Sequence, residues 1–299
     1  EDPVQILRTW IAFEVCISGT ASEHRGYPID IRFMVGGLLE NQPWQYGTVE
    51  SMRTAVIPAG GTGRRMLPLT STIPKPLLPI GMRATLHYIV EECVFSGIER
   101  VGLVTKYRAA DIRDYFESNR FIEFADIELE FIPQGEGWGM ADAIMNAEEF
   151  VGDESFAVLL ADDIVRSRAP AVKQMMEVSE SDYVIGCEKV PLSQVYRYGA
   201  VVPDVQGTDM FRARRIVEKP QPPQVTDIVV AGRYLLRSKV FDVLGAMEDG
   251  HTSLTDALAM ELESGETVMC RILNGVRYDV GSPDGYRRAF VASVEEGWR

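Results

Sequence analysis

The stretch that decides the fold is Thr54–Pro79, with the sequence TAVIPAGGTGRRMLPLTSTIPKPLLP. A short apolar strand ends in a glycine turn over residues 60–63, and two arginines follow at once. Glycine lets the backbone approach a ligand closely, and successive N–H groups can then point at phosphate oxygens. Arg65, together with Lys75 between its two prolines, would supply the positive charge that a polyphosphate needs. The stretch therefore predicts a nucleoside-triphosphate loop that follows the first strand.

Two common phosphate-binding motifs do not fit this loop. A P-loop requires a lysine directly after its last glycine, whereas Arg64 follows Gly63. A dinucleotide fingerprint requires a third glycine, and Met66 occupies that position. The plain alternative is a strand-to-helix turn with surface cations. That alternative does not explain why prolines restrict the backbone on both sides of Lys75.

The composition disfavours several functional classes. With 299 residues, 46% of them hydrophobic, the chain can bury one large core or two smaller ones. A net charge of −14 disfavours a nucleic-acid partner, because a phosphate backbone would be repelled. No apolar run reaches the roughly 18 residues of a membrane span, and no secretory signal is visible. Four scattered cysteines and three histidines disfavour a zinc site and indicate a reducing, cytoplasmic compartment.

From residue 53 onward, apolar strands alternate with helical segments. The pattern predicts strands at 55–58, 101–105, 127–132, 156–161 and 183–187, and helices at 85–96, 111–118, 140–150 and 171–178. Continuously apolar strands joined by helices indicate an α/β fold with a Rossmann-like, mostly parallel sheet and helices on both faces. Ligands bind such sheets at the carboxyl ends of the strands, which is where the glycine turn falls.

Beyond about residue 190 the elements become shorter and more mixed. We expect strands at 200–202, 216–218, 228–235 and 267–273, and helices at 238–246, 254–264 and 285–296. This pattern predicts a smaller, mixed lobe that continues the first sheet. Residues 1–51 show no sustained period, so we expect a weakly ordered N-terminal extension of unknown role, or a short β-rich segment that packs on the main domain or a neighbouring subunit. The catalytic domain is expected to span residues 52–299.

Several motifs, in the same order along the chain, resemble those of the sugar-1-phosphate nucleotidyltransferases. AGGTGRRMLPLT at 59–70 and PKP at 74–76 are similar to the phosphate loop of that family, AGGxGTRLxPLT…PKP. The remaining matches are Gln134 with Gly139, VLLADD at 158–163, YGAV at 198–201, VEKP at 217–220 and RYDVGSPDGY at 277–286. The resemblance covers roughly residues 54–290, and the UTP–glucose-1-phosphate uridylyltransferases are the most similar branch.

The resemblance implies a role for each matched side chain. Arg65 and Lys75 would hold the triphosphate and the departing pyrophosphate, and Lys219 would hold the sugar phosphate. Asp162 and Asp279 would hold Mg²⁺, which prefers hard oxygen ligands, whereas the side chain of Asp163 is expected to point elsewhere. The other implied binding residues are Ala59, Gly60, Gly61, Gly63, Gln134 and Gly139 for the nucleotide, and Gly199, Glu218 and Lys219 for the sugar phosphate.

The chain also departs from the family pattern at positions that bear on its substrates. Arg64 replaces a small threonine, so either arginine could face the phosphates, and the register favours Arg65. Pro76 is commoner among thymidylyltransferases, and the 249–256 segment lacks the glutamate found near sugar and subunit contacts in the family. His87, in an apolar helix, is interpreted as a core residue.

The preferred hypothesis is therefore an enzyme that joins UTP and glucose 1-phosphate into a sugar nucleotide and releases pyrophosphate. A glucose-1-phosphate thymidylyltransferase is the first alternative. A non-catalytic, sugar-nucleotide-binding regulatory protein is the alternative from another class, and a dinucleotide-dependent dehydrogenase is the weakest, because the third glycine is missing. The resemblance also implies a homo-oligomer.

Overall fold

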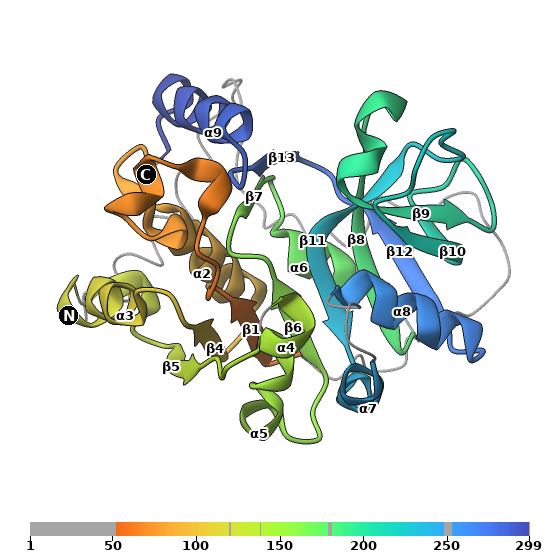
Figure 1. Ribbon diagram of the computed structural model, residues 1–299, viewed down its shortest axis with the longest axis horizontal. Helices are drawn as coiled ribbons and strands as arrows, with labels where there is room; N and C mark the ends of the chain where they lie inside the picture. Colours follow the sequence, from red (N-terminus) through yellow and green to blue (C-terminus); the bar gives the residue numbers. More distant parts are fainter. Residues whose placement is uncertain (1–51, 120, 138, 179–180, 248–252, 299) are drawn as a thin grey trace, which may run out of the picture. The chain divides into compact units, whose positions relative to one another are not determined.

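The computed structural model describes residues 52–298, apart from 120, 138, 179–180 and 248–252 (Figure 1). The expected N-terminal extension and the first half of the departing 249–256 segment, His251 included, lie outside these residues. Within the described part, nine strands form one sheet in the order β5-β4-β1-β6-β11-β8-β12-β10-β9. Two short antiparallel pairs, β13 with β7 and β2 (Pro79–Ile80) with β3 (Arg83–Ala84), stand beside this sheet.

The first half of the sheet is parallel. Its strands are β1 (Thr54–Pro58), β4 (Arg100–Thr105), β5 (Glu128–Pro133) and β6 (Phe156–Leu159). The helices between them are α2 (Thr85–Ser96), α3 (Ala109–Asn119), α4 (Met140–Met145) and α5 (Glu148–Val151). Gly97 caps the C-terminal end of α2 with a φ of 85°, a conformation that favours glycine, and this allows the chain to turn toward β4.

The second half is mixed, as the shorter pattern predicted. It contains β8 (Tyr183–Lys189), β9 (Gly199–Pro203), β10 (Met210–Glu218), β11 (Ile228–Leu236) and β12 (Val268–Ile272). The helices that follow β6 along the chain are α6 (Ala171–Met176), α7 (Val240–Ala246), α8 (Leu254–Glu263) and α9 (Pro283–Glu295). Strand β11 runs antiparallel to both β6 and β8, so it joins the two halves into one sheet.

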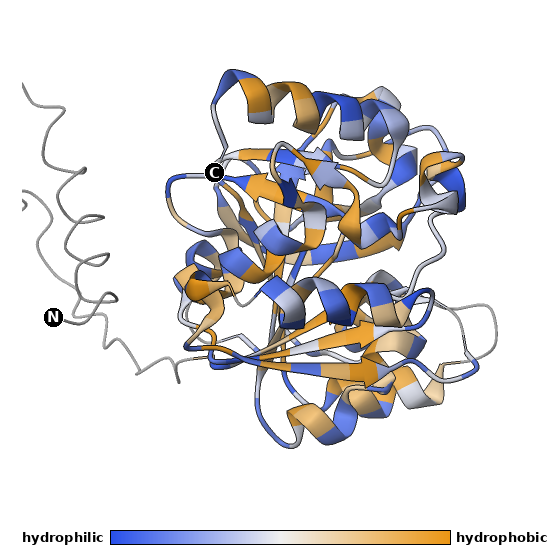
Figure 2. Cartoon of the chain, turned by 90° about the vertical axis from the view of Figure 1, so that its left-hand side faces the viewer, coloured by the Kyte–Doolittle hydropathy of each residue, from blue (hydrophilic) through white to orange (hydrophobic). Residues whose placement is uncertain are grey.

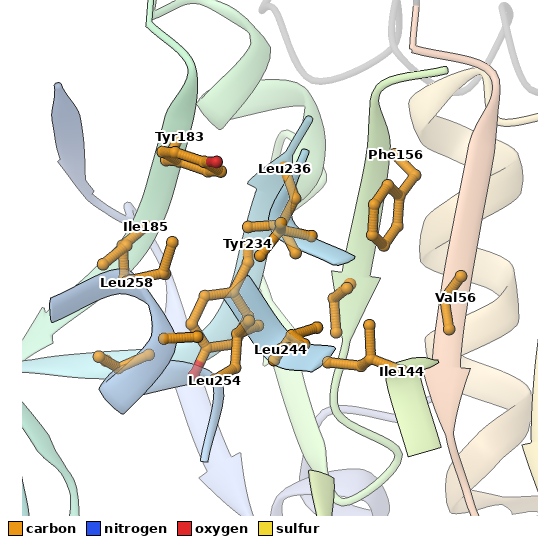
Figure 3. Packing of buried hydrophobic residues seen from close by; sticks show 14 of the residues in the cluster. Val56, Ile144, Phe156, Tyr183, Ile185, Tyr234, Leu236, Leu244, Leu254 and Leu258 are labelled. Atoms are coloured by element: carbon orange, nitrogen blue, oxygen red, sulfur yellow. The ribbon is translucent and has the colours of Figure 1, made fainter. Parts of the chain in front are cut away.

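A hydrophobic core lies on each face of the sheet, which explains the continuously apolar strands. In β1, Ala55 and Ile57 belong to the core under α2, whereas Val56 belongs to the opposite core with Ile144 and Leu244. Figure 3 shows part of the second core, and Figure 2 shows hydrophobic strands between helices that carry hydrophilic residues. The predicted α/β fold with helices on both faces is therefore confirmed.

Some predicted elements were wrong in their boundaries. The predicted helix over 140–150 is two helices, α4 and α5, separated at Asn146 and Ala147. The predicted strand over 156–161 ends at Leu159, because the backbone turns at Leu160, whose carbonyl accepts a hydrogen bond from the N–H of Asp163. Strand β10 begins six residues before the predicted 216–218, since its exposed arginines hid the alternating pattern.

Four short strands were missed altogether, β2 and β3 among them, and the other two bear on the site. These two are β7 (Asp163–Arg166) and β13 (Val276–Asp279), which pair antiparallel so that Asp163 lies opposite Asp279. Each strand has only four residues, two of them charged, so neither has the apolar run that predicts a strand. Their pairing joins segments more than a hundred residues apart and places two candidate acidic segments side by side.

Three of the cysteines lie in the interior, and His87 is the core residue that the sequence predicted. Cys93, Cys187 and Cys270 are buried free thiols, and His87 is fully buried on α2. Burial, reinforced by the nearby charge of Arg83, lowers the pKa of His87 to about 4, so it is a neutral core residue at pH 7. Within the described residues, no helix combines the length and the apolar character that crossing a bilayer requires.

Candidate active site

The phosphate loop folds as three short 3₁₀ turns after β1. They are η2 (Arg64–Met66), η3 (Leu69–Ser71) and η4 (Lys75–Leu77). Gly63 opens the first turn with a φ of 68°, and its carbonyl accepts a 2.8 Å hydrogen bond from the hydroxyl of Thr70. A Cβ at Gly63 would lie 3.0 Å from Cβ of Lys75, so this glycine brings the two ends of the loop together.

A cavity of about 780 Å³ opens at the carboxyl ends of β1, β5 and β6, the edge that the fold class predicted. Every candidate site residue lines it except Gly63, which shapes the loop instead. The cavity also distinguishes between the two arginines that the sequence left open, because Arg65 lines it and Arg64 does not. The candidate residues on its wall are Ala59, Gly60, Gly61, Arg65, Lys75, Gln134, Gly139, Asp162, Gly199, Glu218, Lys219 and Asp279.

Two carboxylates and an ammonium converge on one point of this cavity. A Cβ added at Gly281 would lie 2.5 Å from Oδ2 of Asp162, 3.0 Å from Oδ1 of Asp279 and 2.9 Å from Nζ of Lys75. The two carboxylate oxygens are therefore at most about 5.5 Å apart. Only a residue without a side chain fits between these groups, so Gly281 keeps open a space lined by charged atoms.

Lys75 forms an ion pair with Asp162, and both side chains are largely enclosed, with 14% and 25% of their surface exposed. Burial by itself would raise the pKa of Asp162, but the charges of Lys75 and Arg65 outweigh it and hold that pKa below its ordinary value. Asp162 is therefore an anion at neutral pH and is available as an oxygen ligand.

Asp163 belongs to a different set of contacts. Its Oδ1 accepts a 2.6 Å hydrogen bond from Arg277, and the side chain is almost completely buried. Burial, which the ion pair with Arg277 only partly offsets, raises the pKa of Asp163 to about 7. The ion pair of Asp163 with Arg277 thus links β7 to β13.

The sugar-phosphate motif lies at the end of β10, in the mixed half of the sheet, whereas the phosphate loop follows β1 in the parallel half. Glu218 pairs in register with Gly199 of β9, and its carboxylate accepts a 2.7 Å hydrogen bond from the ammonium of Lys219. Lys219 has a φ of 43°, which is rare for a residue with a side chain, and 63% of that side chain is exposed. Backbone strain of this kind is concentrated at functional sites.

The candidate base-binding residues form a third group. Nε2 of Gln134 donates a 2.6 Å hydrogen bond to Asp142, and Oε1 occupies the space that a side chain at Gly60 would need. The ammonium of Lys106 donates to the carbonyls of residues 135, 136 and 137 at 2.6–3.0 Å. Gln134 is thus fixed next to the glycine turn, with its loop held by Lys106.

Comparison with known proteins agrees with this geometry. Residues 54–296 match the nucleotidyl transferase family. A UTP–glucose-1-phosphate uridylyltransferase of Staphylococcus epidermidis is 36% identical over 267 residues, which cover 81% of this chain and 92% of that protein. The chain belongs to the nucleotidyl transferase family.

Solved structures extend the likeness of this nucleotidyltransferase to three dimensions. A UDP-glucose pyrophosphorylase complexed with UDP-glucose is 29% identical, with a TM-score of 0.75 over 82% of this chain and 99% of that chain. A UTP-bound UGPase from Acinetobacter baumannii, also 29% identical, has a TM-score of 0.73 over 82% of this chain and 94% of that chain. The family resemblance stated from the motifs is therefore confirmed.

Three side chains on the wall of the nucleotidyltransferase cavity were missed by sequence reasoning. Arg197 and Tyr198 both donate to Oδ2 of Asp279, at 3.3 and 3.2 Å. Arg277 lies 4.6 Å from the ring centre of Tyr198 and pairs with Asp163 and Glu188. Tyr198 and Arg277 stand inside the YGAV and RYDVGSPDGY motifs, which could have identified them, whereas Arg197 is marked only by preceding the first of these motifs.

Proposed function

We propose that this nucleotidyltransferase joins UTP and glucose 1-phosphate to give UDP-glucose and pyrophosphate. The observation that carries the proposal is that one cavity contains the phosphate loop, the Asp162–Asp279 pair and the sugar-phosphate motif. The reaction must bring two polyanions together, and the two sets of cations stand on separate elements that line the same cavity. The uridylyltransferase of 36% identity and the pyrophosphorylase with UDP-glucose bound support the choice of substrates.

The donor set fits Mg²⁺. This ion commonly takes one or two carboxylates together with phosphate oxygens of the substrate. Asp162 and Asp279 offer two such carboxylates around an open point, and no cluster of three or more metal-binding side chains exists among the described residues. When bound, Mg²⁺ would neutralise charge on the triphosphate and on the attacking phosphate.

The protein's own groups would act mainly by position and charge. Lys75 would exchange its partner Asp162 for the triphosphate, and Arg65, which is exposed on the loop, would bind the same phosphates. Lys219 would hold the sugar phosphate so that an oxygen of that group attacks the α-phosphorus in line. A phosphate oxygen is already ionised near neutral pH, so the step needs no general base and no covalent intermediate.

The decisive experiment is a coupled pyrophosphate-release assay with purified protein. UTP, dTTP, ATP and GTP would each be combined with glucose 1-phosphate, galactose 1-phosphate or mannose 1-phosphate in the presence of MgCl₂. The proposal expects the highest kcat/KM with UTP and glucose 1-phosphate, and no release after chelation of the metal. Highest turnover with dTTP would establish the thymidylyltransferase alternative, for which Pro76 is the observation in favour. Tight binding of UDP-glucose without any pyrophosphate release would establish the regulatory alternative.

We further infer that copies of the chain associate through α9. Phe290, Val291 and Val294 share one face of this helix and are 41%, 47% and 66% exposed. Apolar side chains grouped on a helix favour contact with another protein surface. Light scattering after gel filtration should give a mass above the 33.4 kDa of one chain, and Val294→Glu should lower it. A wild-type monomer would contradict this inference.

We also propose that residues 52–299 form the catalytic domain by themselves. The family match begins at residue 54, which leaves the N-terminal extension outside it. The truncated chain should therefore equal the full chain in kcat and in melting temperature. A large loss of either would show that the extension packs on the working domain.

A further inference from the structure

We propose that Arg197 is a second cation for the sugar 1-phosphate, and that Asp279 holds it in place until substrate and metal bind. This inference rests on the proposed function, since it concerns the sugar-phosphate side of the same cavity. None of the family motifs found in the sequence contains Arg197. Only the structure places Arg197 on the wall of the cavity.

Arg197 ends the 3₁₀ segment η6 (Leu192–Arg197), directly before β9. Its guanidinium lies 5.2 Å from the ring centre of Tyr198 and 3.3 Å from Oδ2 of Asp279. The side chain lines the cavity and is 36% exposed. It is thus oriented by an aromatic face and a carboxylate while one side remains open to a ligand.

The position of Arg197 assigns it to the sugar phosphate rather than to the triphosphate. The carbonyl of its neighbour Tyr198 accepts a 3.1 Å hydrogen bond from the N–H of Lys219. One residue further on, Gly199 pairs in register with Glu218. Arg197 therefore stands beside the sugar-phosphate motif, whereas the cations of the phosphate loop come from the segment after β1.

Three other cations on the cavity wall either pair with carboxylates or belong to the phosphate loop. The described lining residues include five cations: Arg65, Lys75, Arg197, Lys219 and Arg277. Arg277 is 6% exposed and is neutralised by Asp163 and Glu188, at 2.6 and 2.5 Å. Arg65 and Lys75 belong to the loop, which leaves Arg197 and Lys219 for the second polyanion.

Lys219 by itself is a weak holder of a phosphate monoester. Its ammonium is bonded to Glu218, and its side chain is mostly solvent-exposed, so part of its charge is already compensated and screened. A guanidinium can bind two phosphate oxygens at once, which a lysine ammonium cannot do in the same fixed geometry. Arg197 would thus provide both charge and orientation for the attacking group.

The contact with Asp279 makes this cation available at the right stage. At 3.3 Å, with one nitrogen donating, the bond is longer than the 2.7–2.9 Å typical of strong charge-assisted pairs. Asp279 is also one of the two proposed metal ligands. Binding of the metal to this carboxylate would compete with Arg197, and the released guanidinium would turn to the phosphate beside it.

The test compares Arg197→Ala and Arg197→Lys with the wild type, using the full chain. Arg214→Ala is the matched control, because Arg214 is an exposed arginine of β10 that does not line the cavity. Steady-state rates would give KM for glucose 1-phosphate and KM for UTP separately. Calorimetric titration with glucose 1-phosphate, with and without MgCl₂, would measure binding without any turnover.

We expect Arg197→Ala to raise KM and Kd for glucose 1-phosphate by about 10- to 100-fold, the usual effect of losing a charged hydrogen bond. KM for UTP should stay within about threefold, and Arg197→Lys should recover part of the loss. The MgCl₂ concentration for half-maximal rate should fall in Arg197→Ala, because the metal no longer competes for Asp279. A merely structural arginine would not move this last quantity in that direction.

Three results would overturn the inference. They are an unchanged affinity for glucose 1-phosphate, equal losses for both substrates, or the same loss in Arg214→Ala. If Arg197→Ala melts well below the wild type, Arg197→Lys decides: with wild-type stability it should recover only part of the affinity for glucose 1-phosphate, and an affinity equal to that of the wild type would overturn the inference. Wild-type protein that binds glucose 1-phosphate without releasing pyrophosphate from UTP would contradict the proposed function and leave this test valid.

Discussion

The cavity has two walls of different construction. The loop wall consists of residues 59–76 with Asp162, and its central ion pair is largely enclosed. The sugar wall consists of Arg197, Glu218, Lys219 and Asp279, and the side chains of its two cations are 36% and 63% exposed. Enclosed charges interact more strongly than exposed ones, because less water screens them. The loop wall is thus suited to stabilising the charge that develops in the transition state, and the sugar wall to binding and releasing the sugar phosphate.

This difference predicts that the largest single loss comes from the loop wall. Replacing Lys75 by Ala should lower kcat by on the order of 10²–10³, which is typical when one preorganised charge donor is removed. Arg64→Ala is the matched control from the same loop and should change kcat by less than about threefold, because Arg64 does not line the cavity. Single-turnover rates would measure both. Equal effects of the two substitutions would show that the rate does not depend on whether a cation of this loop lines the cavity.

The next largest effect should come from the point at which the walls meet. A side chain at Gly281 would enter the space between Asp162, Asp279 and Lys75. We expect Gly281→Ala to lower kcat by about 10- to 100-fold, since disturbing the ligands of a metal site costs about this much. The rate of this variant should also respond less to the MgCl₂ concentration. Gly265→Ala is a control for the loss of a glycine in a turn outside the cavity, and it should affect stability alone. Normal activity of Gly281→Ala would show that the two carboxylates do not act on one ion.

The two walls also differ in how far the sequence could predict them. Apart from Asp162, the loop wall is one continuous stretch of sequence. Its glycines, arginines and prolines can be interpreted from their immediate neighbours, so Arg65 and Lys75 could be proposed from residue type and spacing. The sugar wall is assembled by strand pairing. Arg197 and Asp279 are 82 positions apart in the sequence, and no local pattern predicts their contact.

The fold shows the same division between local and long-range information. Strand β1 and helix α2 were predicted well, because an unbroken apolar run or a helical period specifies them. Strands β7 and β13 were missed because only their mutual pairing makes them strands. The ion pair of Asp163 with buried Arg277 could not be foreseen without that pairing.

A smaller effect is expected on the sugar wall itself. Lys219→Ala should raise KM for glucose 1-phosphate by about tenfold and change kcat less, because an exposed charge contributes a modest, salt-screened interaction. The KM of the wild type should also rise between 50 and 500 mM NaCl more steeply than that of the variant. Steady-state kinetics at several salt concentrations would measure both trends. A loss in kcat as large as that of Lys75→Ala would contradict the division of labour between the walls.

The smallest effect tests whether the loop wall extends to the base-binding residues. Lys106 holds the carbonyls of residues 135–137 from the end of β4, and so fixes the loop that follows Gln134. Lys106→Met keeps the length of the side chain but removes three charge-assisted hydrogen bonds. We expect KM for UTP to rise about three- to tenfold, because the loop must then be ordered on binding, while KM for glucose 1-phosphate stays constant. Since the two substrates meet different walls, a rise in both KM values would mean that Lys106 supports the whole cavity rather than its nucleotide side.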